Sequence, residues 1–254
     1  MLVKHRGFRP RVDPTAWIAP TAVILGNVVV GPHVRVLYGA VLTAEGRLPL
    51  AVGDHCVIME HAVLRAAGRW SLELGDHVLV GPYAHLSGCW IGSGSFIATG
   101  AMVFNGARLG RGCVVALDGK VHVDTDLPDD TFVPIGFIAI GRPGRVYPPG
   151  DAPVVHEELN RIGFLRHVFG VDPAGRPRTA VMAEAMSRYT DALGAHRSDQ
   201  IITVGSDGGR RRGRPDADAT MAGREALKRE PGRSRKKGPA SASSAEGFDD
   251  VPTS

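Results

Sequence analysis

Cysteine, aromatic side chains and long apolar runs are all scarce in this sequence. The three cysteines, Cys56, Cys89 and Cys113, lie far apart, which argues against a disulfide framework or a thiol zinc site. Aromatic residues make up only 6% of the chain, and this favours a thin core of aliphatic side chains. No apolar run approaches the roughly 20 residues that a membrane span needs. The N-terminus lacks the apolar segment of a secretory signal, so we expect a cytoplasmic protein with reduced thiols and no membrane partner.

Positive charge is concentrated near the end of the chain. Much of the excess behind the net charge of +4 lies after residue 209, in the tracts GRRRGRP and KREPGRSRKKG. From about residue 198 the composition is rich in Gly, Ser, Arg, Lys and Pro, which is typical of disorder. The segment Arg212-Gly213-Arg214-Pro215 resembles the core of an AT-hook, a minor-groove binder. We predict a disordered basic tail over 198–254 that solubilises the chain and binds nucleic acid only weakly.

A six-residue repeat organises most of the chain. Aliphatic side chains recur at every sixth position, with two interruptions and one shortened rung, and a small or short residue stands four positions after most of them. The aliphatic positions are Ile18, Ile24, Val30, Val36, Leu42, Val52, Ile58, Leu64, Leu74, Val80, Leu86, Ile91, Ile97, Val103, Leu109, Val115 and Val121. Neither an α-helix nor a simple alternating strand has this period. A coil with three rungs per turn does, because stacking the turns buries the aliphatic positions.

The repeat therefore predicts an all-β solenoid, a parallel β-helix, over residues 1–146. Its two interruptions, 43–51 and 65–73, lie one turn apart, so we expect loops that project from the same corner. We expect residues 133–146 to form a segment that closes the coil.

A helical segment is expected over residues 147–197. Apolar residues have helical spacing over 154–170 and again over 179–195, where Met182, Met186, Tyr189 and Leu193 form one stripe. Such stripes usually pack against the rest of the protein, so we expect both helices along the outside of the coil.

The rungs resemble the successive coils of γ-class carbonic anhydrases, in the hexapeptide-repeat transferase superfamily. The resemblance covers about residues 10–170, and its most similar segments are GNVVVGPHVRVLYGAVL, GDHCVIMEHAVLRA, GPYAHLSGCWIG and ATGAMVFNGARLGRGCVV. It implies a left-handed β-helix, a homotrimer and a lyase activity. It also implies zinc or iron, held between subunits by three histidines, that activates water for attack on CO2.

The three metal ligands of that family are missing from this chain. Arg65 follows Ala-Val-Leu, Pro82 follows Val-Gly, and Ser87 precedes Gly-Cys, where the family has histidines. None of the three residue types is a typical zinc ligand. The supporting polar residues also differ, at Thr43-Ala44-Glu45 and at Glu60, and such residues normally orient the ligands. We therefore predict a divergent member of the family without CO2 hydration.

Other histidines lie close to the family's site. His85 and His122 flank inward positions on the same outer face, and His61 stands at a corner nearby. We predict that His61, His85 and His122 hold any relocated metal, with zinc as the candidate. Glu60, Arg65 and Ser87 are the candidate binding residues, because Arg65 suits an anionic ligand. The alternative is structural: solvated histidines also recur at corners, as at His33, His55 and His77, and Arg65 forms a salt bridge with Glu60 or Glu45 across the trimer.

Three functions stay open at this point, and no catalytic residue is identified. The first is a carbonic-anhydrase-like homotrimer with an altered metal site or a small-anion site between subunits. The second is a hexapeptide acyltransferase, because those enzymes share the coil and end in segments like GRPGRV. Those acyltransferases share a long loop that carries a catalytic histidine, and they have a CoA cleft between coils. The loops of this chain are short and contain no histidine. The third is a scaffold trimer without catalysis.

Overall fold

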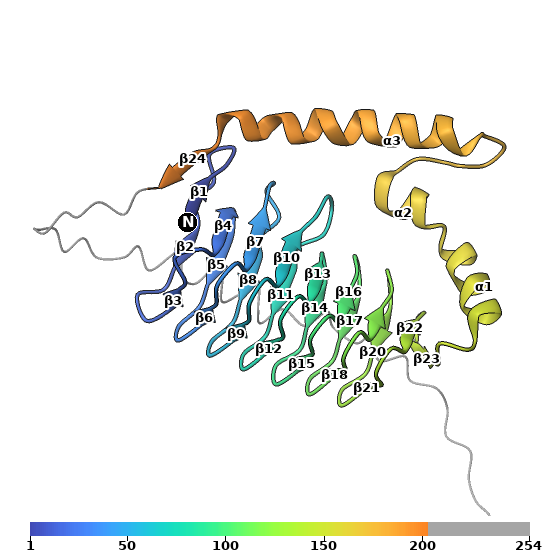
Figure 1. Cartoon of the computed structure of the whole chain (residues 1–254), viewed down its shortest axis with the longest axis horizontal. Helices are drawn as coiled ribbons and strands as arrows, with labels where there is room; N and C mark the ends of the chain where they lie inside the picture. The colour runs from blue at the N-terminus through green and yellow to red at the C-terminus, as the bar shows by residue number, and fades with distance from the viewer. Residues whose placement is uncertain (203–254) are drawn as a thin grey trace, which may run out of the picture. The chain divides into compact units, whose positions relative to one another are not determined.

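The computed structural model describes residues 1–202, and most of them form a left-handed parallel β-helix (Figure 1). The chain passes repeatedly through three sheets, which form the three faces of the coil. The first sheet contains, in spatial order, β23 (Arg145–Tyr147), β22 (Ile138–Ile140), β19 (Lys120–Val121), β16 (Met102–Val103), β13 (His85–Ser87), β10 (Val63–Ala66), β7 (Val41–Ala44), β4 (Val23–Gly26), β1 (Leu2–Lys4) and β24 (Gln200–Ile202).

The other two sheets contain seven strands each, and all of these are parallel. The second sheet contains β2 (Arg11–Val12), β5 (Val28–Val30), β8 (Leu50–Val52), β11 (Leu72–Leu74), β14 (Trp90–Ile91), β17 (Arg108–Leu109) and β20 (Asp126–Leu127). The third contains β21 (Phe132–Val133), β18 (Val114–Val115), β15 (Phe96–Ile97), β12 (Leu79–Val80), β9 (Val57–Ile58), β6 (Arg35–Val36) and β3 (Trp17–Ile18).

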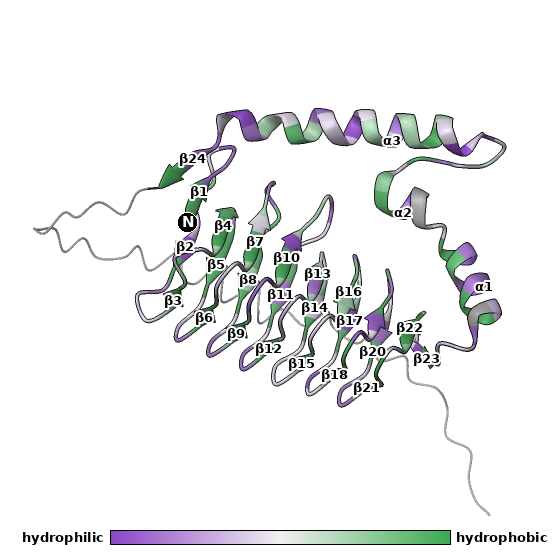
Figure 2. Cartoon of the chain, in the orientation of Figure 1, coloured by the Kyte–Doolittle hydropathy of each residue, from purple (hydrophilic) through white to green (hydrophobic). Residues whose placement is uncertain are grey.

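The predicted rung phase is confirmed by burial. Apart from Ile18, which lies in an end rung and is half-buried, every predicted aliphatic position is buried in one continuous core. The outward residues beside them are more exposed: in β15, Phe96 is 40% exposed whereas Ile97 is 0% exposed. The strands are largely hydrophobic and the corner turns largely hydrophilic, as Figure 2 shows. The stacked aliphatic side chains therefore hold successive turns together.

Histidines at one corner adopt a conformation that usually favours glycine. His33, His55 and His77 have φ values of 57°, 55° and 59°, in the left-handed region. Their rings form a ladder of tilted pairs, with centroids 4.6 Å and 5.2 Å apart. The three are solvent-facing corner residues, in agreement with the structural alternative stated for them above.

The two interruptions of the repeat project from the same corner, as predicted, but they are shorter than expected. β7 and β8 enclose the first, and β10 and β11 enclose the second. The ends of both predicted loops are strand residues, which pair with the neighbouring turns. The coil also begins earlier than Ile18, because β1 pairs with β4 and β2 pairs with β5.

Three helices follow the coil: α1 (Ala152–Ile162), α2 (Phe164–Phe169) and α3 (Arg178–Leu193). The predicted single helix over 154–170 is divided at Gly163, which ends α1 with a φ of 67°. The 3-10 helix η1 (Gly194–Ser198) and β24 come next, and β24 pairs antiparallel with β1. The expected start of the tail at 198 was therefore wrong, because residues 200–202 are strand residues. The basic tracts predicted to form the tail lie outside the described residues.

None of the helices in residues 1–202 combines the length and the hydropathy that a membrane span requires.

Candidate functional site

A cavity of about 470 Å³ lies against the outer face of the first sheet. Its walls come from β10, β13, the residues after β16, the loop after β10, and helices α2 and α3. The polar residues that line it are Arg6, Glu45, Arg65, His85, Ser87, Asn105 and Tyr189. The larger apolar ones are Leu48, Trp70, Phe104, Val123, Val168 and Phe169. An apolar cavity with a few convergent polar groups is the usual form of a small-molecule site.

Strand register brings three predicted residues into this cavity. Arg65 in β10 pairs with Ser87 in β13, and His85 stands two residues before Ser87. Since alternate residues of a strand point to the same side, all three side chains face outward around inward Leu64 and Leu86. This placement agrees with the position inferred from the rung phase.

Arg65 is held in place by two partners. Its Nη2 donates to Oε1 of Glu45 at 3.3 Å and to the hydroxyl of Tyr189 at 3.1 Å. Burial lowers the pKa of Arg65, but the interactions with Tyr189 and Glu45 outweigh it and raise the pKa above its ordinary value. Its Nε and Nη1 make no hydrogen bond with residues 1–202. The guanidinium therefore stays charged and keeps donors for a ligand.

His85 has a lowered pKa and ring nitrogens without a hydrogen-bond partner in residues 1–202. Burial lowers its pKa below the ordinary value, and the positive charge of Arg65 lowers it further. Within the described part of the chain neither ring nitrogen has a hydrogen-bond partner, and neither is fully buried. A neutral imidazole in a cavity can accept a proton from a bound molecule.

Ser87 and Asn105 add two more polar groups to the cavity. They are only 8% and 7% exposed. Their side chains make no hydrogen bond with the rest of the described chain, and their polar atoms are not fully buried. Both can therefore donate hydrogen bonds to a ligand in the cavity.

The structure does not bring Glu60, His61 and His122 to this cavity. His61 lies at a corner with a φ of 57° and stacks on Tyr83, with ring centroids 5.2 Å apart. His122 lies on the first sheet beside Phe104, with ring centroids 6.1 Å apart. Burial lowers the pKa of His122, and the nearby His167 adds to this effect.

The residues at the family's ligand positions do not fit the metal that the resemblance implies. Arg65 is a cation and donates hydrogen bonds only, and proline offers no side-chain ligand atom. Within residues 1–202, the one group of three His, Cys, Asp or Glu side chains whose ligand atoms gather within 4.8 Å contains none of the predicted ligands. A relocated metal on His61, His85 and His122 stays a prediction for a site between subunits.

Helix α2 is anchored beside the cavity by a polar network. His167 contacts Oδ2 of Asp124 at 3.1 Å, and Arg142 donates to Oδ1 of the same carboxylate at 2.9 Å. Trp70 lies against the ring of His167, with centroids 4.9 Å apart. This network fixes the apolar wall that α2 contributes.

Sequence reasoning missed Trp70, Asn105 and Tyr189. Tyr189 lies 124 residues after Arg65, and nothing in the repeat indicates where α3 crosses the coil. Arg65 does pair with Glu45, but within one chain and not across a trimer as expected.

No family model matches the sequence, and no curated protein matches it significantly. Among solved structures, it is similar to a protein from Bacillus cereus assigned as an acetyltransferase, with 22% identity over 75% of this chain and 96% of the other, and a TM-score of 0.44. A hexapeptide transferase family protein from Anaplasma phagocytophilum shows 21% identity over 76% and 97%, with a TM-score of 0.42. The UDP-N-acetylglucosamine acyltransferase of Francisella novicida shows 15% identity over 73% and 87%, with a TM-score of 0.43. The likeness concerns the fold, a left-handed β-helix of hexapeptide repeats.

Proposed function

We propose that the protein is an enzyme that transfers an acyl group to a hydroxyl or amino group, with His85 as the general base. One observation supports this most: His85, whose pKa is lowered, and charged Arg65 line the same cavity, and both keep nitrogen atoms without a hydrogen-bond partner in residues 1–202. The choice of acyl transfer rests on analogy with the chemistry that this fold often carries. It is the second of the functions weighed from the sequence.

Arg65 binds an anionic group of the substrate. Its planar guanidinium forms strong, paired hydrogen bonds with carboxylates and phosphates. Glu45 and Tyr189 hold one end of the guanidinium, so the other end is oriented before a ligand arrives. The substrate class is therefore a small molecule with a carboxylate or phosphate beside a nucleophilic hydroxyl or amine.

His85 moves one proton in each direction during the reaction. As the acceptor oxygen or nitrogen forms its bond to the carbonyl carbon of a thioester, the neutral ring takes the acceptor's proton. The carbon–sulfur bond then breaks, and the thiolate takes that proton from the ring. His85 returns to its neutral form, and no metal or redox partner is needed.

A thioester assay tests this function. Purified protein is mixed with acetyl-CoA and a panel of amino and hydroxy acids or their phosphates, and thiol release is measured. We expect acceptor-dependent release that His85→Ala reduces by about 10²–10⁴-fold, the usual contribution of a general base. His33→Ala, at the corner ladder, is the matched control and should leave the rate unchanged. Equal rates for wild type and His85→Ala would refute the role of His85.

One specific observation favours the carbonic-anhydrase-like function. Arg65 and Ser87 pair in register at the positions that correspond to two family ligands. We propose that they retain a small-anion site there, without CO2 hydration. Calorimetry should then detect bicarbonate binding to wild type and none to Arg65→Met. That result, together with no reacting acceptor in the thioester assay, would favour the small-anion site over acyl transfer.

A homotrimer is proposed for both readings. The third sheet supports it, because its outer register column is apolar apart from Arg35: it runs through Trp17, Arg35, Val57, Leu79, Phe96, Val114 and Phe132. Three of these, Trp17, Phe96 and Phe132, are 44%, 40% and 59% exposed in the single chain. Exposed apolar surface of this extent normally marks an interface.

A further inference from the structure

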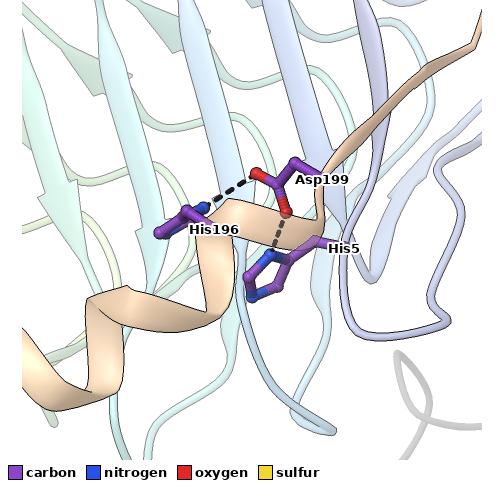
Figure 3. Close-up of side chains that lie close together, drawn as sticks. All are labelled: His5, His196 and Asp199. Atoms are coloured by element: carbon purple, nitrogen blue, oxygen red, sulfur yellow. Dashed lines mark hydrogen bonds and ion pairs between the residues drawn. The ribbon is translucent and has the colours of Figure 1, made fainter.

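A second polar cluster lies where the two ends of the described chain meet. His5 follows β1 at the start of the coil, whereas His196 belongs to η1 and Asp199 follows it directly. In Figure 3 the two imidazole rings approach the Asp199 carboxylate from different sides. Neither the predicted site nor the cavity around His85 includes these three residues.

The three side chains are close enough to share one ion. Nδ1 of His5 lies 2.5 Å from Oδ1 of Asp199, and Nδ1 of His196 lies 2.9 Å from Oδ2. The two imidazole rings have centroids 4.5 Å apart. One ligand atom from each residue lies within 4.8 Å of the others. A metal ion about 2.1 Å from each ligand therefore needs only a small rearrangement of these side chains.

Burial distinguishes this cluster from a solvated surface group. His5 is 1% exposed, and its Nε2 has no hydrogen-bond partner in residues 1–202. The buried ring directs its other nitrogen, Nδ1, at the Asp199 carboxylate, so the ligand atom is held in place by the surrounding protein.

A second carboxylate, that of Glu45, stands beside the cluster. Oε2 of Glu45 lies 3.7 Å from Nε2 of His196, while its Oε1 accepts a hydrogen bond from Arg65. Glu45 thus lies between the cluster and the cavity. Together the residues offer two imidazoles and two carboxylates, a mixed nitrogen and oxygen set that zinc and neighbouring divalent metals prefer.

We propose that His5, His196 and Asp199 bind one divalent transition-metal ion, with zinc as the first candidate. The ion replaces the hydrogen bonds between the imidazoles and the carboxylate. Because His5 precedes the rest of the coil and Asp199 precedes β24, the ion ties the C-terminal strand to the first turn. The site shares a neighbour, Glu45, with the cavity, but the proposal does not rest on acyl transfer.

Zinc titration of the full chain, after treatment with a chelator and without an affinity tag of histidines, tests the site. Isothermal calorimetry should give one zinc per chain, and the melting temperature should rise with zinc. Asp199→Asn keeps an oxygen that accepts a hydrogen bond but loses the anionic ligand, so it should weaken zinc binding at least tenfold. Cobalt should give a visible absorption band with wild type that Asp199→Asn abolishes.

The corner ladder provides the matched control. His33→Ala removes a histidine from a pair of tilted rings but lies outside the cluster. It should leave zinc affinity unchanged. His196→Ala is a second variant in the cluster, because its side chain is 33% exposed and its loss disturbs the core less than the loss of His5. Absence of stoichiometric zinc in wild type, or equal zinc affinity in wild type, Asp199→Asn and His196→Ala, would overturn the proposal.

Discussion

Truncation of one inward side chain tests the stacking that holds the coil together. Ile97 is 0% exposed and lies in register between Val80 and Val115 of the adjacent turns. Ile97→Ala removes buried methyl groups and leaves a cavity that parallel strands on both sides cannot close. We expect a loss of about 2–5 kcal/mol in the free energy of unfolding. With about 2–4 °C per kcal/mol for a chain of this size, the melting temperature should fall by roughly 4–20 °C.

The preceding residue of the same strand is the control. Phe96 points outward and is 40% exposed in the single chain, so Phe96→Ala should cost about 1 kcal/mol or less within the chain. Because Phe96 belongs to the proposed trimer interface, the variant should otherwise weaken only the association of subunits. Thermal melting followed by circular dichroism compares the two variants, at several protein concentrations to separate unfolding from dissociation. If Phe96→Ala destabilises the chain at all concentrations as much as Ile97→Ala does, the assignment of inward and outward positions is wrong.

Three further predictions concern CO2 hydration at the site, the oligomeric state, and the stability of the fold at low pH. Stopped-flow measurements with added zinc should detect no CO2 hydration above background, because Arg65 and Ser87 replace ligands; a zinc-dependent rate would contradict this. Light scattering at micromolar concentration should give about three times 26.9 kDa, and a monomer would remove the inter-subunit interface. Burial keeps the pKa values of His85 and His122 in the folded chain below their ordinary value. As the pH falls below about 6.5, the unfolded chain therefore binds more protons than the folded chain, and the free energy of unfolding decreases. Chemical unfolding at pH 7 and pH 5 measures this loss, which His85→Gln should reduce.

The coil could be predicted from the sequence because its stabilising contacts repeat with a fixed period. Each aliphatic position meets its equivalents one turn away, so local spacing already specifies a long-range contact. The first turn lies within the predicted bounds of 1–146, but the repeat does not mark its strands, because Val3 and Val12 are separated by a loop that breaks the period. The division at Gly163 depends on one left-handed residue, which apolar spacing does not detect.

The candidate site was predicted only as far as the repeat extends. The rung phase placed Arg65, His85 and Ser87 on one outer face, and the strand register agrees. It did not predict Tyr189, because the position of α3 is set by side-chain packing outside the repeat. The His5 cluster is beyond sequence reasoning for the same reason, since its partners are 194 residues apart.

The ionisation of His85 is the most direct test of the proposed active site. Histidine-selective NMR should give His85 a pKa below 6.5, and its ring signals should move when a carboxylate or phosphate ligand fills the cavity. Arg65→Met should raise this pKa, because the variant removes the positive charge that helps to keep the ring neutral. A pKa at or above 6.5 in wild type, unchanged by Arg65→Met and by ligand, would contradict the account.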